Sequence, residues 1–141
     1  MTQLRELYRC EVCGNVVEIV NEGQPALVCC DQPMKKLEAK TEDEGQEKHV
    51  PVVEDEGSAT CTCDSCGEDN VCIKVKVGST EHPMTDEHYI KCIEVLTKDS
   101  VLRKELKPGD KPEAHFCCVS KDDIAEVREF CTVHMLWKNS V

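Results

Sequence analysis

The sequence has few aromatic residues, fewer basic than acidic residues and no long apolar run, and each of these features argues against a class of function. Aromatic residues make up 4% of the 141 positions, which disfavours the stacking platforms that bind single-stranded nucleic acid. Lys and Arg total 17 against 28 Asp and Glu, and the net charge of -11 argues against a phosphate-binding surface. No apolar run approaches the roughly 18 residues that span a bilayer, and no secretory signal is visible in MTQLRELYRC. The sequence therefore predicts a cytoplasmic protein with no nucleic-acid or membrane partner.

The chain is instead rich in cysteine, with twelve among its 141 residues. So many cysteines indicate either a secreted disulfide scaffold or an intracellular metal protein. The absence of a signal, the short C-x-x-C spacings and the histidines near several cysteines favour metal.

Residues 1–37 are predicted to form a small unit with four cysteines at its ends. An apolar run at 16–20, a turn-rich stretch and a second apolar run at 26–28 predict a hairpin. Such a unit is too small to be stable on its core alone. Four thiolates suit iron or zinc, and a structural zinc knuckle or a pair of disulfides are the alternatives. The candidate ligands are Cys10, Cys13, Cys29 and Cys30.

The adjacent pair, Cys29 and Cys30, requires a special backbone. Consecutive side chains point to opposite sides of an extended chain, so both can bind one ion only if the chain bends there.

Residues 38–46 are acidic and read as a linker, and 47–141 are predicted to form an antiparallel β-sandwich or barrel. Residues 71–77 alternate between apolar and other side chains with the two-residue period of a strand. Further strands are expected at 90–97, 101–106, 114–119 and 127–130, with a turn at 107–110. Residues 122–128 fit either a strand or a short helical turn. The fold class is therefore mainly β.

A second metal site is indicated by histidines in separate segments of this larger region. Neutral imidazole and thiolate together suit a borderline or soft metal ion, and Cys131 and His134 are spaced to share one. For any single histidine, an ordinary core or solvated role is the alternative. The candidate ligands are His49, His82, His88, Cys131 and His134.

These motifs carry a resemblance to a known family that covers the chain from Cys10 to Trp137. C-x-x-C followed after fifteen residues by C-C resembles desulforedoxin. EKHVPV, H-P-M followed by H-Y-I, and C-x-x-H-x-x-W resemble the superoxide reductases. The whole chain resembles a desulfoferrodoxin-type, two-iron superoxide reductase.

The resemblance implies an FeCys4 centre in residues 1–37 and a catalytic Fe(His)4(Cys) centre in a seven-stranded, immunoglobulin-like sandwich. It implies that the four histidines bind iron equatorially and that Cys131 is the axial thiolate. Lys48 would attract superoxide and help to deliver protons, and Glu47 would bind the oxidised iron and assist product release; an ordinary charged turn is the alternative. A homodimer and a rubredoxin-like electron donor are also implied.

The segment between His49 and His82 is longer than the resemblance leads us to expect. An insertion at about 56–72 contains Cys61, Cys63, Cys66 and Cys72. They fit a third site for zinc or an iron–sulfur cluster, a disulfide-bonded loop, or free thiols. By contrast, small buried side chains are expected at Cys92, Cys117 and Cys118.

Two departures lie beside Cys131. Met135 stands where a small residue is expected, and Phe130 stands where the family has an aromatic residue with a hydroxyl.

The function predicted is the one-electron reduction of superoxide to hydrogen peroxide, with the FeCys4 centre as an electron relay. A superoxide dismutase is one alternative, and a non-catalytic electron-transfer or metal-handling protein is another.

Overall fold

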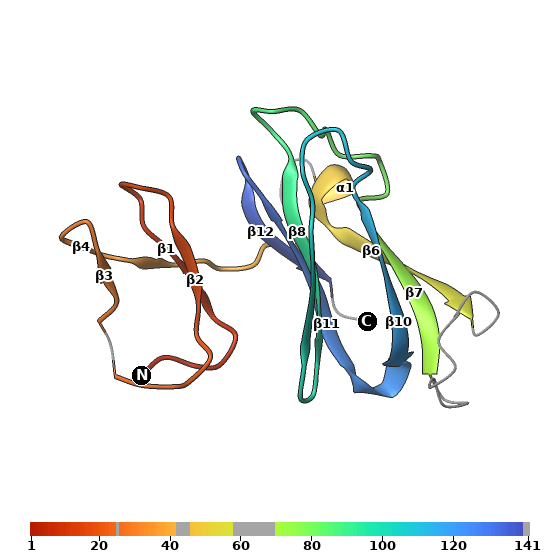
Figure 1. The fold of residues 1–141 in the computed structure, drawn as a ribbon, viewed down its shortest axis with the longest axis horizontal. Coiled ribbons are helices and arrows are strands. Elements are labelled where there is room, and N and C mark those ends of the chain that lie inside the picture. The colour runs from red at the N-terminus through yellow and green to blue at the C-terminus, as the bar shows by residue number, and fades with distance from the viewer. Residues whose placement is uncertain (25, 42–45, 58–69, 140–141) are drawn as a thin grey trace. The chain divides into compact units, whose positions relative to one another are not determined.

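The computed structural model describes residues 1–24, 26–41, 46–57 and 70–139. The chain divides into two compact units, Met1–Glu38 and Ala39–Val141. In both units, the regular secondary structure of the described residues is mainly β-strand, as predicted (Figure 1).

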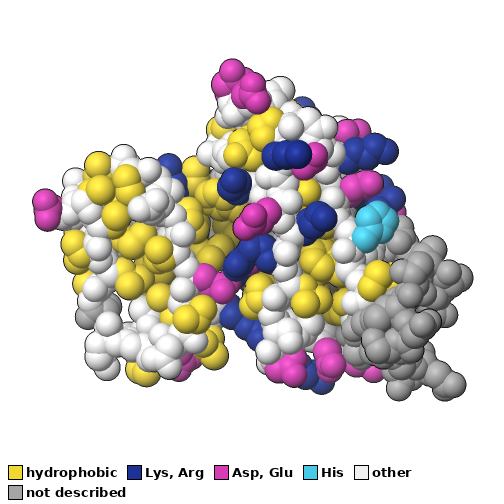
Figure 2. All heavy atoms as spheres, in the orientation of Figure 1, with side chains coloured by type: hydrophobic (Ala, Val, Ile, Leu, Met, Phe, Trp, Pro, Cys, Tyr) yellow, Lys and Arg dark blue, Asp and Glu magenta, His cyan; other side chains and the backbone are white. Residues whose placement is uncertain are grey.

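The first unit contains short strands and little apolar core. Strand β1 pairs antiparallel with β2 and β5, and β3 pairs with β4. The strand bounds are β1 Leu7–Arg9, β2 Val16–Glu18, β3 Val28–Cys29, β4 Gln32–Pro33 and β5 Lys35–Lys36. Leu7, Cys10 and Ile19 are its buried apolar residues among those described, whereas Val12, Val20 and Val28 are exposed. Figure 2 shows hydrophobic atoms over much of this unit's visible surface.

In the second unit, the described residues form an antiparallel sandwich of seven strands. One sheet has the order β10-β7-β6 and the other β12-β11-β8-β9 (Figure 1). A four-residue helix, α1 Gln46–His49, precedes β6, and η1 Lys121–Asp123 is a single 3-10 turn between β10 and β11. The strand bounds are β6 Pro51–Gly57, β7 Asn70–Val77, β8 Ile90–Thr97, β9 Val101–Glu105, β10 Glu113–Ser120, β11 Ile124–Cys131 and β12 Met135–Asn139.

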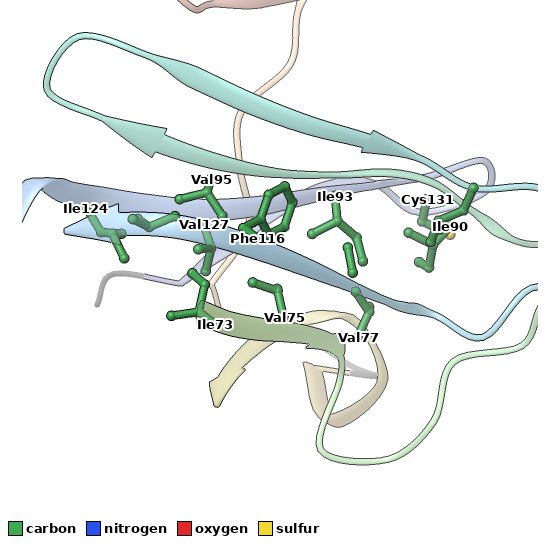
Figure 3. Close-up of a cluster of buried hydrophobic side chains, with 13 residues drawn as sticks. Ile73, Val75, Val77, Ile90, Ile93, Val95, Phe116, Ile124, Val127 and Cys131 are labelled. Carbon is green, nitrogen blue, oxygen red and sulfur yellow. The ribbon is translucent and has the colours of Figure 1, made fainter. Parts of the chain in front are cut away.

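The core lies between the two sheets, because apolar and other side chains alternate along the strands, as the sequence predicts. Ile73, Val75 and Val77 of β7 face Ile93 and the neighbouring apolar residues of the opposite sheet (Figure 3). Cys131 and Ile90 pair across β11 and β8 and lie together at one end of this cluster (Figure 3). The apolar core therefore reaches the predicted histidine–cysteine site.

Three local features differ from the sequence prediction or resolve it. Residues 122–128 contain both alternatives, since η1 ends at Asp123 and β11 begins at Ile124. In the segment read as a linker, Lys40 forms a bridge to Trp137, donating its N–H to the Leu136 carbonyl and accepting one from Lys138. Cys117 is exposed, so its prediction as a buried small residue is wrong. The side chain of Cys118 lies outside the described residues.

Two candidate metal centres

The four cysteines of the first unit converge on one point. Their sulfur atoms all lie within 4.8 Å of one another. Cys13 Sγ is 3.6 Å from Cys29 Sγ, and Cys29 Sγ is 3.9 Å from Cys30 Sγ. Sulfurs at these separations can surround a single ion, and Cys10 forms the buried side of the cluster.

The backbone bends where the adjacent cysteines require it. Cys30 and Asp31 have φ angles of 53° and 60°, in the left-handed region that ordinary side chains rarely adopt. This bend turns both neighbouring thiols toward the same point, as predicted. On the opposite loop, Gly14 has φ of 85°, and its N–H closes the turn by donating to the Cys10 carbonyl.

Backbone amides prepare this cluster to hold negative charge. The N–H of Cys13 points at Cys10 Sγ at 3.5 Å. This hydrogen bond is the main cause that lowers the pKa of Cys10 to about 6. Hydrogen bonds to the sulfurs of Cys13 and Cys10 raise the pKa of Cys29 to about 12. Four thiolates would be stable here only beside a cation.

The second cluster is built from segments that are distant in sequence. His49 ends α1, His82 and His88 lie between β7 and β8, and Cys131 ends β11. One ligand atom from each of these four residues lies within 4.8 Å of the others. The His134 ring lies beside them, with its centroid 4.6 Å from that of His49 and 5.0 Å from that of His88. The structure thus brings all five sequence-predicted side chains together.

His82 is oriented with one ring nitrogen aimed at the centre. Its Nδ1 lies 2.7 Å from the Pro83 carbonyl oxygen, which can only accept, so Nδ1 carries the proton. Nε2 therefore holds a lone pair, 3.1 Å from His49 Nε2 and 3.5 Å from Cys131 Sγ. Burial lowers the pKa of His82 to about 4, which keeps the imidazole neutral.

His88 supplies the clearest sign of a missing partner. Its Nε2 is buried and has no hydrogen-bond partner among the residues that the structure describes. The main chain of His88 is fixed by Thr85, whose hydroxyl and carbonyl both accept the His88 N–H. Burial lowers the pKa of His88, and the charges of His134 and Lys48 lower it further. A buried, neutral imidazole nitrogen without a partner fits a metal ligand.

Cys131 and Trp137 complete the surroundings of the centre. Burial raises the pKa of the Cys131 thiol, and the backbone N–H groups of His134 and Val133 oppose that shift. Trp137 stacks on His49 and donates its Nε1–H to the His134 carbonyl at 3.1 Å. The sequence motif C-x-x-H-x-x-W contains Trp137, but the motif alone does not predict this supporting role.

Both clusters fit a metal ion by their donor chemistry. Four thiols suit iron or zinc, and imidazoles with one thiol suit a borderline ion such as ferrous iron. The residues would hold one ion in each unit, which agrees with the two centres predicted.

Of the remaining predicted site residues, the structure describes the side chains of Lys48 and Cys72 only. Lys48 is exposed at the end of α1, close enough for its charge to act on His88. The Glu47 side chain lies outside the described residues, as do Cys61, Cys63 and Cys66. Cys72 lies on β7 with its sulfur 2.8 Å from that of Cys117.

A four-cysteine unit followed by a β-sandwich with a histidine–cysteine cluster defines a two-centre, non-haem metalloprotein. The desulfoferrodoxin family matches residues 41–140, and its N-terminal domain matches residues 2–37. The chain belongs to the desulfoferrodoxin family, which confirms the resemblance found in the sequence.

Relatives match along almost the whole chain. A desulfoferrodoxin homolog from Archaeoglobus fulgidus is 48% identical over 139 residues, covering 99% of each protein. A desulfoferrodoxin from Syntrophotalea carbinolica is 42% identical over 139 residues, covering 99% of this chain and 98% of its own. Among solved structures, the superoxide reductase from Treponema pallidum has a TM-score of 0.70 at 28% identity, with 98% of each chain covered.

No helix in the described parts of the chain is long and apolar enough to cross a membrane.

Proposed function

We propose that this protein is a superoxide reductase, which converts superoxide into hydrogen peroxide at a mononuclear iron centre in the β-sandwich. The convergence of His49, His82 and His88 with the thiol of Cys131 is the observation that carries the proposal. Membership of the desulfoferrodoxin family supports it. The proposed ligands are His49, His82, His88, Cys131 and His134.

The reaction consumes one electron and two protons for each superoxide. Ferrous iron, when bound, supplies the electron and a coordination position for the substrate. As a thiolate, Cys131 would make a bound iron more electron-rich than imidazoles alone would. The Pro83 carbonyl fixes the tautomer and orientation of His82, and Trp137 fixes the ring plane of His49.

Lys48 is proposed to attract the substrate and supply protons. Superoxide is an anion approaching a chain with a net charge of -11, so a local positive charge is needed to favour the encounter. Lys48 is exposed, is next to His49 in sequence, and acts electrostatically on His88. We assign to the neighbouring Glu47 the role of an anionic ligand that assists product release.

The four-cysteine centre is proposed to hold a second iron and to relay or store electrons. A rubredoxin-like protein is the proposed external donor, and a homodimer in the cytoplasm is the proposed working form. Reduced thiols and intact thiolate centres persist most readily in a reducing compartment.

Two alternative functions predict different chemistry from the same residues. A dismutase would return the metal to its starting state without an external donor, whereas a reductase is oxidised by its substrate. An electron-transfer or metal-handling protein would not depend on the His/Cys centre for reaction with superoxide.

The test is a superoxide pulse given to reduced, iron-loaded protein. We expect wild type to remove superoxide rapidly as its second-unit iron is oxidised. Cys131→Ser should lose most of this reactivity while retaining the four-cysteine centre. Cys92→Ser is the matched control, because it also removes one thiol from the same sheet. Unchanged reactivity in Cys131→Ser would contradict the proposal.

A further inference from the structure

A pair of thiols lies outside both metal centres, in the three-stranded sheet of the sandwich. The sulfur of Cys72 on β7 is 2.8 Å from the sulfur of Cys117 on β10. Both residues are reduced in the structure. A sulfur–sulfur bond measures about 2.05 Å, so bond formation requires an approach of less than one ångström.

An irregularity in strand pairing brings these two residues together. Phe116 pairs with Ile73 and Val119 pairs with Val71, so two residues of β10 stand opposite Cys72 alone. This is a β-bulge, which redirects side chains locally. Facing residues of antiparallel strands have Cα atoms about 4.5–5.5 Å apart, within the range that a disulfide spans.

The two thiols differ in access to solvent. Cys117 is exposed, whereas Cys72 is only 2% exposed. Both belong to the sheet face that points away from the core, since Ile73 and Phe116 beside them point into it. An oxidant arriving from solvent therefore meets Cys117 first, and Cys72 is in place to react with the oxidised sulfur.

We propose that Cys72 and Cys117 form a reversible, peroxide-oxidised thiol pair. In the first step, the Cys117 sulfur attacks one oxygen of hydrogen peroxide, the O–O bond breaks, and a sulfenic acid and one water form. In the second, Cys72 attacks that sulfur, the S–O bond breaks, and a disulfide and a second water form. The two thiols lose two electrons and two protons, and one peroxide is reduced to two waters.

The source of the oxidant rests on the proposed function, because hydrogen peroxide is the product of superoxide reduction. Each turnover of superoxide would release hydrogen peroxide from the same protein that carries the Cys72–Cys117 pair. A dithiol reductant reverses the step by thiol–disulfide exchange. The pair would then record peroxide exposure as a cross-link between β7 and β10.

Cys92 provides an internal contrast. Burial is the main cause that raises its pKa to about 12, so it holds almost no reactive thiolate at neutral pH. Cys92 should therefore remain reduced while Cys117 reacts.

The test adds hydrogen peroxide directly to full-length, iron-loaded protein that has been reduced and desalted without oxygen. The reaction is quenched with acid, free thiols are alkylated, and the protein is cleaved after Glu and Lys. Cleavage places Cys72 in the peptide DNVCIK and Cys117 in the peptide AHFCCVSK, which also contains Cys118. We expect these peptides to be joined with the loss of two hydrogens, and a dithiol to separate them.

Variants identify the sulfurs that take part. Cys117→Ser should abolish the cross-link and leave Cys72 alkylated, and its exposed position makes this substitution compatible with folding. Cys118→Ser and Cys92→Ser should retain the link. Persistence of the link in Cys117→Ser, a link from Cys72 to any other cysteine, or full alkylation of both thiols after peroxide would overturn the proposal.

The superoxide assay is run separately on the same samples. Since peroxide is added directly, failure to form the link does not bear on superoxide reduction. Cys117→Ser should reduce superoxide as wild type does, because Cys117 belongs to neither metal centre. A link formed in protein that does not reduce superoxide would support the thiol pair and contradict the proposed function.

Discussion

The indole of Trp137 lies nearly parallel to the imidazole of His49, with ring centroids 4.7 Å apart and an interplanar angle of 16°. The same indole donates its N–H to the His134 carbonyl oxygen, and the Lys40 ammonium lies 5.4 Å from its ring centroid. Trp137 is 1% exposed. One buried side chain therefore positions two of the proposed ligands.

The double role of Trp137 predicts that its N–H matters separately from its ring. Trp137→Phe keeps an aromatic face for His49 and removes the hydrogen bond to His134. We expect it to retain iron about 10–100-fold more weakly at the second centre, the usual effect of losing an outer partner of a ligand. Competition with a chelator would measure this, and iron retention equal to wild type would contradict it. Trp137→Ala should also lower the free energy of unfolding by about 3–5 kcal/mol.

Lys48 is expected to act through its charge. Lys48→Glu should slow the second-order reaction with superoxide by about tenfold at low ionic strength, and Lys48→Ala should slow it less. The difference from wild type should shrink as salt is added. Lys104→Glu on β9 is the control, since it makes the same charge change at another exposed lysine. An equal effect at Lys104 would assign the result to net charge and not to Lys48.

The first unit should depend on its metal for folding. Its buried apolar residues among those described are Leu7, Cys10 and Ile19, which is too small a core to offset chain entropy. Removing metal should expose residues 1–38 to rapid amide hydrogen exchange while the strands of the sandwich stay protected. Cys30→Ser should also speed amide hydrogen exchange in residues 1–38, but less than complete removal of the metal. Continued protection of residues 1–38 in metal-free protein would contradict this prediction.

Glu129 is expected to make the sandwich less stable as pH rises. Its side chain is fully buried, and neither carboxylate oxygen has a hydrogen-bond partner among the described residues. Burial raises its pKa well above the ordinary value of 4.5. The folded protein therefore keeps a proton that the unfolded chain loses, and stability falls as pH rises above 4.5, by about 1.4 kcal/mol per pH unit until the folded-state pKa is passed.

Glu129→Gln tests this effect because it removes the ionisation but keeps the shape. The free energy of unfolding of the iron-loaded protein can be measured by denaturant titration at several pH values from about 5 to 8. It should decline less steeply with pH in the variant than in wild type. Glu105→Gln, an exposed change on β9, should leave the wild-type slope. Parallel curves for wild type and Glu129→Gln would show that Glu129 is ionised in the folded protein.

Much of the sandwich could be predicted because its strands follow simple periods. The alternation of side chains around Val75 predicts β7, and the proline and glycine before Asp110 predict the turn there.

The backbone conformation at Met135 could not be predicted from the pattern of apolar and polar residues. Its φ of 67° lies in the left-handed region, which explains why a small residue, above all glycine, is the natural choice there.

The candidate ligands could be named from spacing and resemblance, but their supporting contacts could not. The Pro83 carbonyl orients His82 through a hydrogen bond to the neighbouring residue, and no sequence period reports such a contact. The Cys72–Cys117 pair depends on a bulge that shifts the strand register, so membership of a strand alone could not show that the Cys117 side chain is exposed.

The most direct test of the account counts hydrogen peroxide formed per superoxide consumed, using fully reduced, iron-loaded protein without a donor and with superoxide limiting. We predict one peroxide for each superoxide, with a matching loss of ferrous iron at the histidine–cysteine centre. One peroxide for every two superoxides, with the iron returned to its starting state, would identify a dismutase and contradict the account.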